Sequence, residues 1–273
     1  MTANTLCAGA CEVLQTGDPG AKAAAGQALA LNWRRGGIAV ITGPDDPMPL
    51  SRPARPDRPE LRRPGDMPRR RLSGPRGRIA LLHAIAHIEL NAIDLAWDII
   101  ARFANTGSNS RMPRAFFDDW VGVAADEGRH FTLVCERLAE LGTAYGDLPA
   151  HDGLWQAAKD TAHDLTARLA VVPMVLEARG LDVTPAMAAK LRSAGDGSSA
   201  DLLQLILDDE IGHVAVGRHW FEWICQRDGL TPTTHWRAMV AAHFKGALKP
   251  PFNHQARKQA GMGTEYYHSV NLC

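Results

Sequence analysis

The sequence predicts an all-α protein built around four long helices, and three observations support this prediction. From residue 79 onward, apolar residues recur at three- and four-residue steps rather than in alternation, which is typical of amphipathic helices. The 273-residue chain is 45% hydrophobic and 22% charged, as in ordinary folded proteins. Glycines follow the long periodic stretches, as expected at helix ends: Gly107, Gly142, Gly180 and Gly229.

The first 78 residues predict a pair of short helices followed by an irregular strap. The helices are expected at 5–14 and 21–33, the second entered through Asp18 and Pro19. From 43 to 77 proline, arginine and glycine disfavour regular structure. Residues 52–78 hold ten arginines against three acidic residues, an excess of seven. We interpret this strap as a connector lying on an acidic surface; a nucleic-acid contact is the alternative, weakened by the absence of aromatics that could stack on bases.

The four long helices are expected at 79–105, 113–141, 153–179 and 200–228. A shorter helix is expected at 232–244, and the tail turns at Pro250 and Pro251 and should fold back on the bundle. The predicted organisation is therefore an N-terminal region (1–78), a four-helix bundle (79–230), and a C-terminal helix and tail that pack on the bundle (231–273).

Each long helix places an ionisable side chain on its apolar stripe. Glu89 lies on the first stripe and Glu177 on the third, whereas the second and fourth each present a Glu-x-x-His pair. Carboxylates are rarely buried alone, because desolvation drives them to find a partner or take up a proton. Two divalent cations would neutralise four carboxylates. The predicted metal ligands are Glu89, Glu127, His130, Glu177, Glu210 and His213.

Two further features fit such a site. Asp126 and Asp209 each precede a ligand glutamate and are expected to accept the far N–H of a ligand histidine, which would fix its tautomer. Pro173 lies four residues before Glu177, where it removes a helix hydrogen bond and is expected either to kink the helix beside the site or to provide a packing bend.

The order of these residues resembles the metal-ligand pattern of the ferritin-like superfamily. More narrowly, the chain is similar to a bacterial ferritin-like family known mainly as a domain of unknown function. The runs that support this are at 87–90 (HIEL), 112–116 (MPRAF), 127–130 (EGRH), 145–153, 172–182, 209–213 (DEIGH) and 250–253 (PPFN). The resemblance covers most of the chain and implies a ferritin-like bundle with a dinuclear site, but no particular reaction.

Members of that superfamily differ in chemistry, and the sequence disfavours three of them. Tyr145, Tyr266 and Tyr267 all lie off the four stripes, which argues against a tyrosyl-radical generator. No Cys-x-x-Cys pair supplies a rubredoxin-like site. The long N- and C-terminal regions are unlike a storage ferritin, which is usually a bare bundle.

The favoured function is an O2-dependent oxidase or hydroxylase with two non-haem iron ions, or a Mn/Fe pair. It would act on a small-molecule substrate with an external electron donor, and catalytic residues beyond the ligands are not assigned. The alternatives are a ferroxidase or iron-handling protein, a tRNA-modifying hydroxylase that uses the arginine-rich strap, and a non-enzymatic, metal-stabilised interaction module. A small homo-oligomer fits any of these.

Composition and charge narrow the setting. Every candidate membrane-spanning run is broken by charged residues or histidine, and the N-terminus lacks the basic and apolar parts of a secretory signal. The 30 basic and 30 acidic residues balance, so bulk charge does not favour a polyanion. Five scattered cysteines indicate reduced thiols. The expected location is the cytoplasm.

Overall fold

A computed structural model describes residues 3–62, 66, 74–104, 112–151 and 153–268. The chain is all-α, with a single two-residue strand pair among the described residues, and it divides into two compact units, Met1–Trp155 and Gln156–Cys273. The all-α prediction is confirmed. The three-part division at 78 and 230 stays a prediction, and Arg69, Arg70 and Arg71 of the strap lie outside the described residues.

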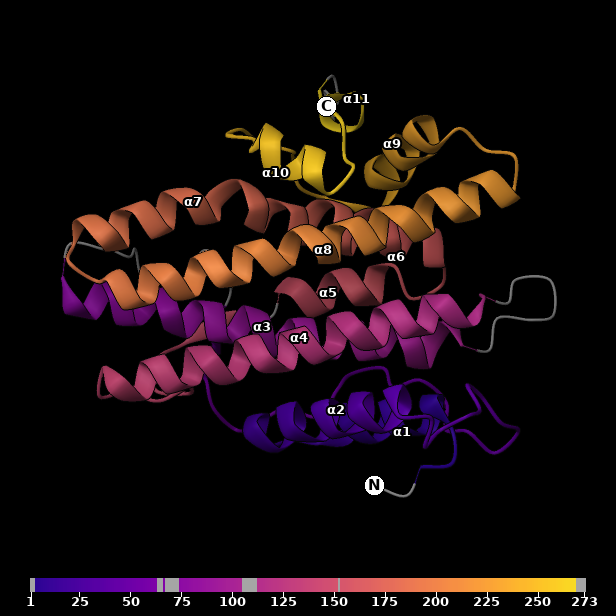
Figure 1. The fold of residues 1–273 in the computed structure, drawn as a ribbon, viewed down its shortest axis with the longest axis horizontal. Coiled ribbons are helices and arrows are strands. Elements are labelled where there is room, and N and C mark those ends of the chain that lie inside the picture. Colours follow the sequence, from indigo (N-terminus) through magenta and orange to yellow (C-terminus); the bar gives the residue numbers. More distant parts are fainter. Residues whose placement is uncertain (1–2, 63–65, 67–73, 105–111, 152, 269–273) are drawn as a thin grey trace. The chain divides into compact units, whose positions relative to one another are not determined.

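The first unit is a helical layer built on two long helices. α3 (Pro75–Phe103) and α4 (Arg114–Glu140) pack along each other, and α1 (Leu6–Gln15) and α2 (Pro19–Arg34) lie against them (Figure 1). Large aromatic side chains, including Trp97 and Trp120, are buried in its core. A Cβ on Gly26 of α2 would lie 2.8 Å from the indole nitrogen of Trp97, so this glycine permits the close approach of α2 to α3.

The first helices begin where the sequence predicts. The Thr5 hydroxyl accepts a hydrogen bond from the Ala8 amide at the start of α1, and the Asp18 carboxylate accepts one from Ala21 at the start of α2. Pro19 takes the first helical position of α2, where its missing N–H costs nothing.

The strap contains one short strand that the sequence does not predict. β1 (Leu61–Arg62) pairs in parallel with β2 (Ala150–His151), Leu61 opposite Ala150 and Arg62 opposite His151. The predicted start of the first long helix at residue 79 is also late, since Pro75 begins α3. Proline fits there because the first turn of a helix needs no donor from it.

A buried ionic network fixes the beginning of the strap to α2 and α3. The Lys22 ammonium lies 2.6 Å from the Asp94 carboxylate and donates to the Ala54 carbonyl at 2.9 Å. Arg55 reaches the other oxygen of Asp94 at 3.0 Å and donates to Asn91 at 2.7 Å. The side chains of Lys22 and Asp94 are 1% and 0% exposed, so each charge depends on this network.

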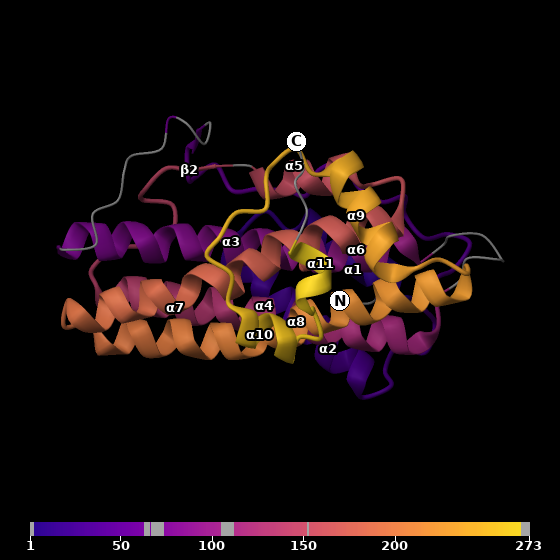
Figure 2. The same cartoon turned by 90° about the horizontal axis from the view of Figure 1, so that it is seen from above.

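The second unit contains the remaining helices. They are α6 (Leu165–Val171), a π-helix (Val172–Glu177), α7 (Ala178–Ser193), α8 (Gly197–Arg227), α9 (Pro232–His243), α10 (His254–Gln259) and α11 (Thr264–Tyr267); α5 (Gly153–Asp160) spans the boundary of the two units. α7 and α8 run side by side, as Figure 2 shows in orange. α6 packs against α8 and α9.

The predicted continuous helix at 153–179 is wrong. α5 ends at Asp160, and the Asp164 carboxylate accepts hydrogen bonds from the Thr166 and Ala167 amides to begin α6. The buried Arg168 guanidinium donates to the Thr161 hydroxyl at 2.8 Å, which holds the break closed. An aspartate inside an apolar stripe had looked like a surface position, but its side chain competes for backbone amides and starts a new helix.

Gly180 does not end this part of the chain either. α7 continues through Gly180 and Pro185 to Ser193, and Gly195, with a φ of +79°, follows its end. That left-handed conformation favours glycine, so Gly195 is the helix terminator.

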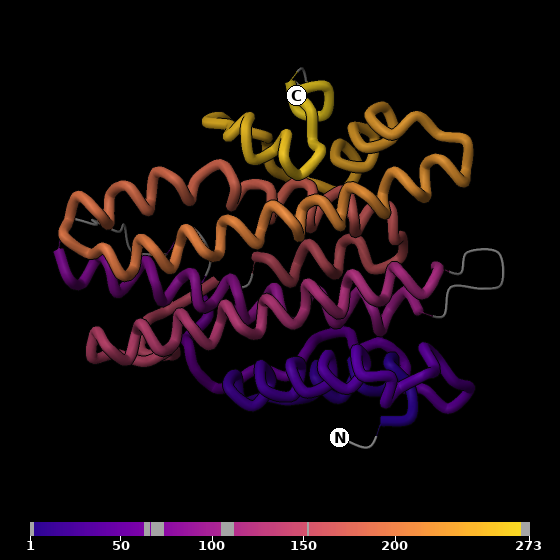
Figure 3. The backbone as a smooth tube through the Cα atoms, in the orientation of Figure 1, coloured from indigo at the N-terminus to yellow at the C-terminus, as the bar shows by residue number. Residues whose placement is uncertain are grey.

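The tail after α9 folds back onto α7 and α8, as the yellow segment in Figure 3 shows. Arg257 of α10 forms two hydrogen bonds to the buried carboxylate of Asp182 on α7, at 2.8 and 2.7 Å. The Asn253 amide donates to the same carboxylate at 2.9 Å, and its side chain donates to the Leu181 carbonyl. The Pro250–Pro251 bond that precedes this contact is cis.

Candidate metal centre

The first unit brings three of the predicted ligands together. Glu89 lies in the middle of α3, and Glu127 and His130 lie one turn apart on the facing side of α4. All three are buried, with exposed fractions of 4%, 0% and 0%. Gly128, between the two α4 ligands, has the Ala23 carbonyl of α2 3.3 Å from the place of a Cβ, so α2 covers this turn closely.

The geometry of this cluster fits a metal ion. One ligand atom from each of Glu89, Glu127 and His130 lies within 4.8 Å of the others. The His130 Nδ1 atom is 3.4 Å from a Glu89 oxygen and 3.6 Å from a Glu127 oxygen. Ligands about 2.1 Å from one ion are separated by roughly 3.0 Å at right angles and 4.2 Å when opposite. Both measured separations fall in that interval, so a buried Glu/His cluster that could hold a metal ion is present.

Without a metal, the two carboxylates control the charge of His130. Burial acts to lower the pKa of His130, but the Glu127 and Glu89 carboxylates outweigh it and raise that pKa to about 11. The metal-free imidazole is therefore a buried cation at neutral pH, paired with two anions. A metal would take the place of the proton on Nδ1, because a ligating imidazole must be neutral.

The second unit contains the other three predicted ligands. On α8 the Nδ1 atom of His213 lies 3.5 Å from a Glu210 oxygen, and their side chains are 4% and 13% exposed. This is the same one-turn relation as between Glu127 and His130 on α4. Glu177, which is half-buried, is the last residue of the π-helix.

The π-helix gives the position of Glu177 a local cause. Pro173 lies at its start, where it supplies no backbone donor. The proline ring packs on Gly217 of α8: a Cβ there would be only 2.3 Å from the proline Cβ and Cγ atoms. The predicted bend at Pro173 thus takes the form of a widened π turn, an element that is frequent at functional sites.

The two aspartates expected to orient the ligand histidines stay a prediction. Asp126 is 41% exposed and lies 3.2 Å from the Arg129 guanidinium on its own helix. Asp209 is half-buried on α8.

A histidine and tyrosine cluster beside Glu89 is the part of this region that the sequence did not predict. His87 Nε2 lies 2.8 Å from the His151 carbonyl, which can only accept, so Nε2 carries the proton and Nδ1 accepts from the Tyr145 hydroxyl at 2.8 Å. Burial lowers the pKa of His87 to about 4, which keeps it neutral. His83 Nε2 accepts from the Gly146 amide at 2.9 Å. These contacts tie the segment after α4 to α3, within one turn of Glu89.

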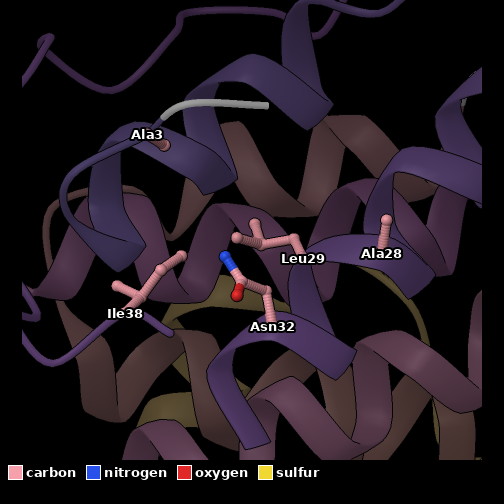
Figure 4. A pocket seen from close by; sticks show the side chains of 5 residues that line it. All are labelled: Ala3, Ala28, Leu29, Asn32 and Ile38. Carbon is pink, nitrogen blue, oxygen red and sulfur yellow. The ribbon is translucent and has the colours of Figure 1, made fainter. Parts of the chain in front are cut away.

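A separate pocket of about 240 Å³ lies by α2, lined by Ala3, Ala28, Leu29, Asn32 and Ile38 (Figure 4). Asn32 is the one polar side chain of the five, and none of them titrates. This lining offers no acid, base or charged metal ligand, so we do not assign chemistry to it.

Two further properties bear on the class of protein. Among the described residues, α3 alone is long and apolar enough to cross a membrane, and 78% of its most apolar stretch is buried inside the protein, as in the core helix of a soluble protein. The described cysteines, Cys7, Cys11, Cys135 and Cys225, are free thiols.

Comparisons with known proteins agree on a family without an assigned activity. The model of a family described as "Protein of unknown function (DUF455)" matches residues 15–268. An uncharacterized protein of Haemophilus influenzae is 44% identical over 207 residues, which is 76% of this chain and 72% of that protein. No solved structure matches the chain.

Proposed function

Since the chain belongs to the DUF455 family of proteins of unknown function, its activity has to be argued from its own side chains, and we propose that it is a dinuclear metal oxidoreductase. It would bind two non-haem iron ions, or a Mn/Fe pair, and use O2 to oxidise or hydroxylate a small organic substrate. The observation that supports this most directly is the buried cluster of Glu89, Glu127 and His130.

The charge of that cluster favours a divalent cation. Two carboxylates buried to this degree carry a desolvation penalty that a nearby positive charge must offset. A protonated His130 supplies one positive charge against two negative ones. A divalent ion supplies two and frees the histidine to ligate, so metal binding is the more complete way to neutralise the site.

We infer that Glu177, Glu210 and His213 complete the same centre. The two sets have matching chemistry: each contains one lone glutamate and one Glu-x-x-His pair on a helix. One glutamate from each of two helices and Glu-x-x-His from each of the other two is the ligand set of dinuclear carboxylate proteins with a bundle fold.

Such a ligand set suits oxygen chemistry with iron. Carboxylate oxygens and imidazole nitrogens favour the higher oxidation states of iron, and the bound metal pair would supply the redox chemistry of O2 activation. The protein side chains around α3 and α4 would hold the ligands and exclude water, since Phe131 and Val134, one turn from the ligands, are buried. A small-molecule substrate, an external electron donor and a cytoplasmic location belong to this proposal.

The test is reconstitution without oxygen using ferrous iron, or manganese and iron together, followed by elemental analysis and O2-electrode measurements. We expect about two metals per chain and O2 consumption that needs an organic substrate and reductant for turnover. Glu127→Gln keeps the shape of the side chain and should lower metal content at least tenfold. Glu140→Gln is the matched control, because Glu140 lies on the same helix with a side chain that is 64% exposed.

The outcome also separates the alternatives. Many irons per chain in a large assembly would favour iron storage, and two irons that oxidise without organic turnover would favour a ferroxidase. Turnover on tRNA alone would favour the tRNA hydroxylase, and stable metal binding without O2 reactivity would favour a metal-stabilised interaction module. Equal metal content in Glu127→Gln and the parent protein would contradict the proposal itself.

A further inference from the structure

The second unit contains a pocket that the proposed metal chemistry does not use. It has a volume of about 170 Å³ and lies between the start of α7, with the π-helix before it, and the segment that follows α9. Much of its wall is apolar: Val175 and Leu176 come from the π-helix, and Phe244, Leu248 and Phe252 come from the returning segment. Val175 is buried, and the other four are half-buried.

The charged side chains of the pocket leave it positive. Arg257 and Asp182 are both buried and neutralise each other through two hydrogen bonds. Arg179 and Lys249 remain, and three cations against one carboxylate give the lining a net charge of +2. Arg179 lies 3.6 Å from Asp182 and donates to the carbonyls of Lys249 and Pro251, which holds its guanidinium against the returning segment.

The burial of the lining gives the pocket a direction. Its buried end is formed by Val175 and the neutral Arg257–Asp182 pair, whereas Lys249 and Ala247 are exposed at the outer end. An anion at the outer end would meet Lys249 and Arg179 without displacing any existing ion pair. The apolar wall behind them suits a hydrocarbon chain.

We propose that this pocket binds a small-molecule carboxylate with a short aliphatic chain. At roughly 30 Å³ per non-hydrogen atom, the volume of a water molecule in the liquid, the pocket holds about six such atoms. Hexanoate fits: its five alkyl carbons fill the apolar part, and its carboxylate stays at the outer end beside Lys249 and Arg179. The proposal does not depend on a metal, so binding is measured on the metal-free full-length chain.

The experiment is a ligand-observed NMR titration with three probes of equal chain length: hexanoate, hexyl phosphate and hexylamine. We expect hexanoate to bind in the millimolar range and hexylamine to bind at least several-fold more weakly, because the lining repels a cation. Hexyl phosphate that binds more tightly than hexanoate would overturn the assignment to a carboxylate. Hexanoate and hexylamine that bind equally would overturn the role of the charge.

Variants locate the binding. Lys249→Gln should weaken hexanoate about two- to fivefold, as for a solvent-exposed ion pair, and the difference should shrink in high salt. Lys258→Gln is the matched control, since Lys258 is also exposed in the tail but does not line the pocket. Ala247→Leu fills the outer end and should abolish binding of hexanoate. Undiminished binding to Ala247→Leu, with an unchanged thermal unfolding curve, would place the ligand elsewhere and refute the proposal.

Discussion

Replacing Gly217 by alanine tests whether the contact between α8 and the π-helix positions Glu177. The added Cβ would lie 2.3 Å from both the Cβ and the Cγ of Pro173. Carbon atoms in good contact are about 3.5 to 4.0 Å apart, so one of the two elements must move by at least roughly 1.2 Å. The proline ring cannot rotate away, because it is closed on its own backbone.

The magnitude follows from two opposing effects. Overpacking of this kind costs up to about 3 kcal/mol, and replacing a mid-helix glycine by alanine returns about 1 kcal/mol of helix propensity. We expect Gly217→Ala to lower the free energy of unfolding by about 2 kcal/mol. Gly212→Ala is the control: it lies in the same helix, and no atom lies within 4 Å of the place of its Cβ. It should be stabilised by up to about 1 kcal/mol.

The two variants should therefore differ by about 3 kcal/mol, a factor of roughly one hundred in the unfolding equilibrium. Urea denaturation monitored by tryptophan fluorescence measures this difference, and elemental analysis of the iron-loaded proteins shows whether the shift reaches Glu177. If Gly217→Ala is as stable as Gly212→Ala, the packing of Pro173 on α8 is not what shapes the π-helix, and the argument for the position of Glu177 fails.

Three other predictions concern buried charges. The carboxylate-paired His130 has its pKa raised to about 11, so its stabilisation of the metal-free protein is complete below its ordinary pKa of 6.5 and is lost as the pH rises through 11; the difference between the parent and His130→Gln in urea melts should shrink over that range, and a constant difference would contradict it. Lys22→Met deprives the buried Asp94 of its closest cation and should cost about 3 kcal/mol in a urea melt, whereas loss of the exposed ion pair in Arg192→Met should cost less than about 1 kcal/mol. Arg257→Leu breaks the buried ion pair that fixes the tail and should speed tryptic cleavage between residues 244 and 268; an unchanged cleavage rate would show that the tail is held by other contacts.

Most of the helical architecture could be predicted from the sequence, because amphipathic periodicity and N-terminal caps are local signals. α4 and α9 begin and end within a residue or two of their expected bounds. The stretch from 153 to 193 could not be predicted this way. Its breaks depend on the Asp164 cap and on an arginine, Arg168, that is fully buried against Thr161, and neither side chain differs in type from a surface residue.

The candidate site divides in the same way. Glu89, Glu127 and His130 were predictable because their spacing places them on apolar stripes, and the structure brings these three together. The contacts of His87 with Tyr145 were not predictable, because they join residues 58 positions apart through a segment with no periodicity. The charged pocket beside α7 likewise depends on how the tail returns, which no local pattern specifies.

The π-helix has a consequence for how this chain tolerates changes in length. A π turn closes its hydrogen bonds over one more residue than an α turn, so it amounts to a single inserted residue within a helix. Deleting one residue between 172 and 177 would allow an ordinary α-helix to form, and would rotate everything after it by about 100° relative to everything before it. Glu177 and the start of α7 would then face a different direction, although no ligand had been mutated. In this segment the number of residues sets the geometry as strictly as their identity does, and a one-residue gap in a relative's alignment here indicates a change in the direction of the following glutamate.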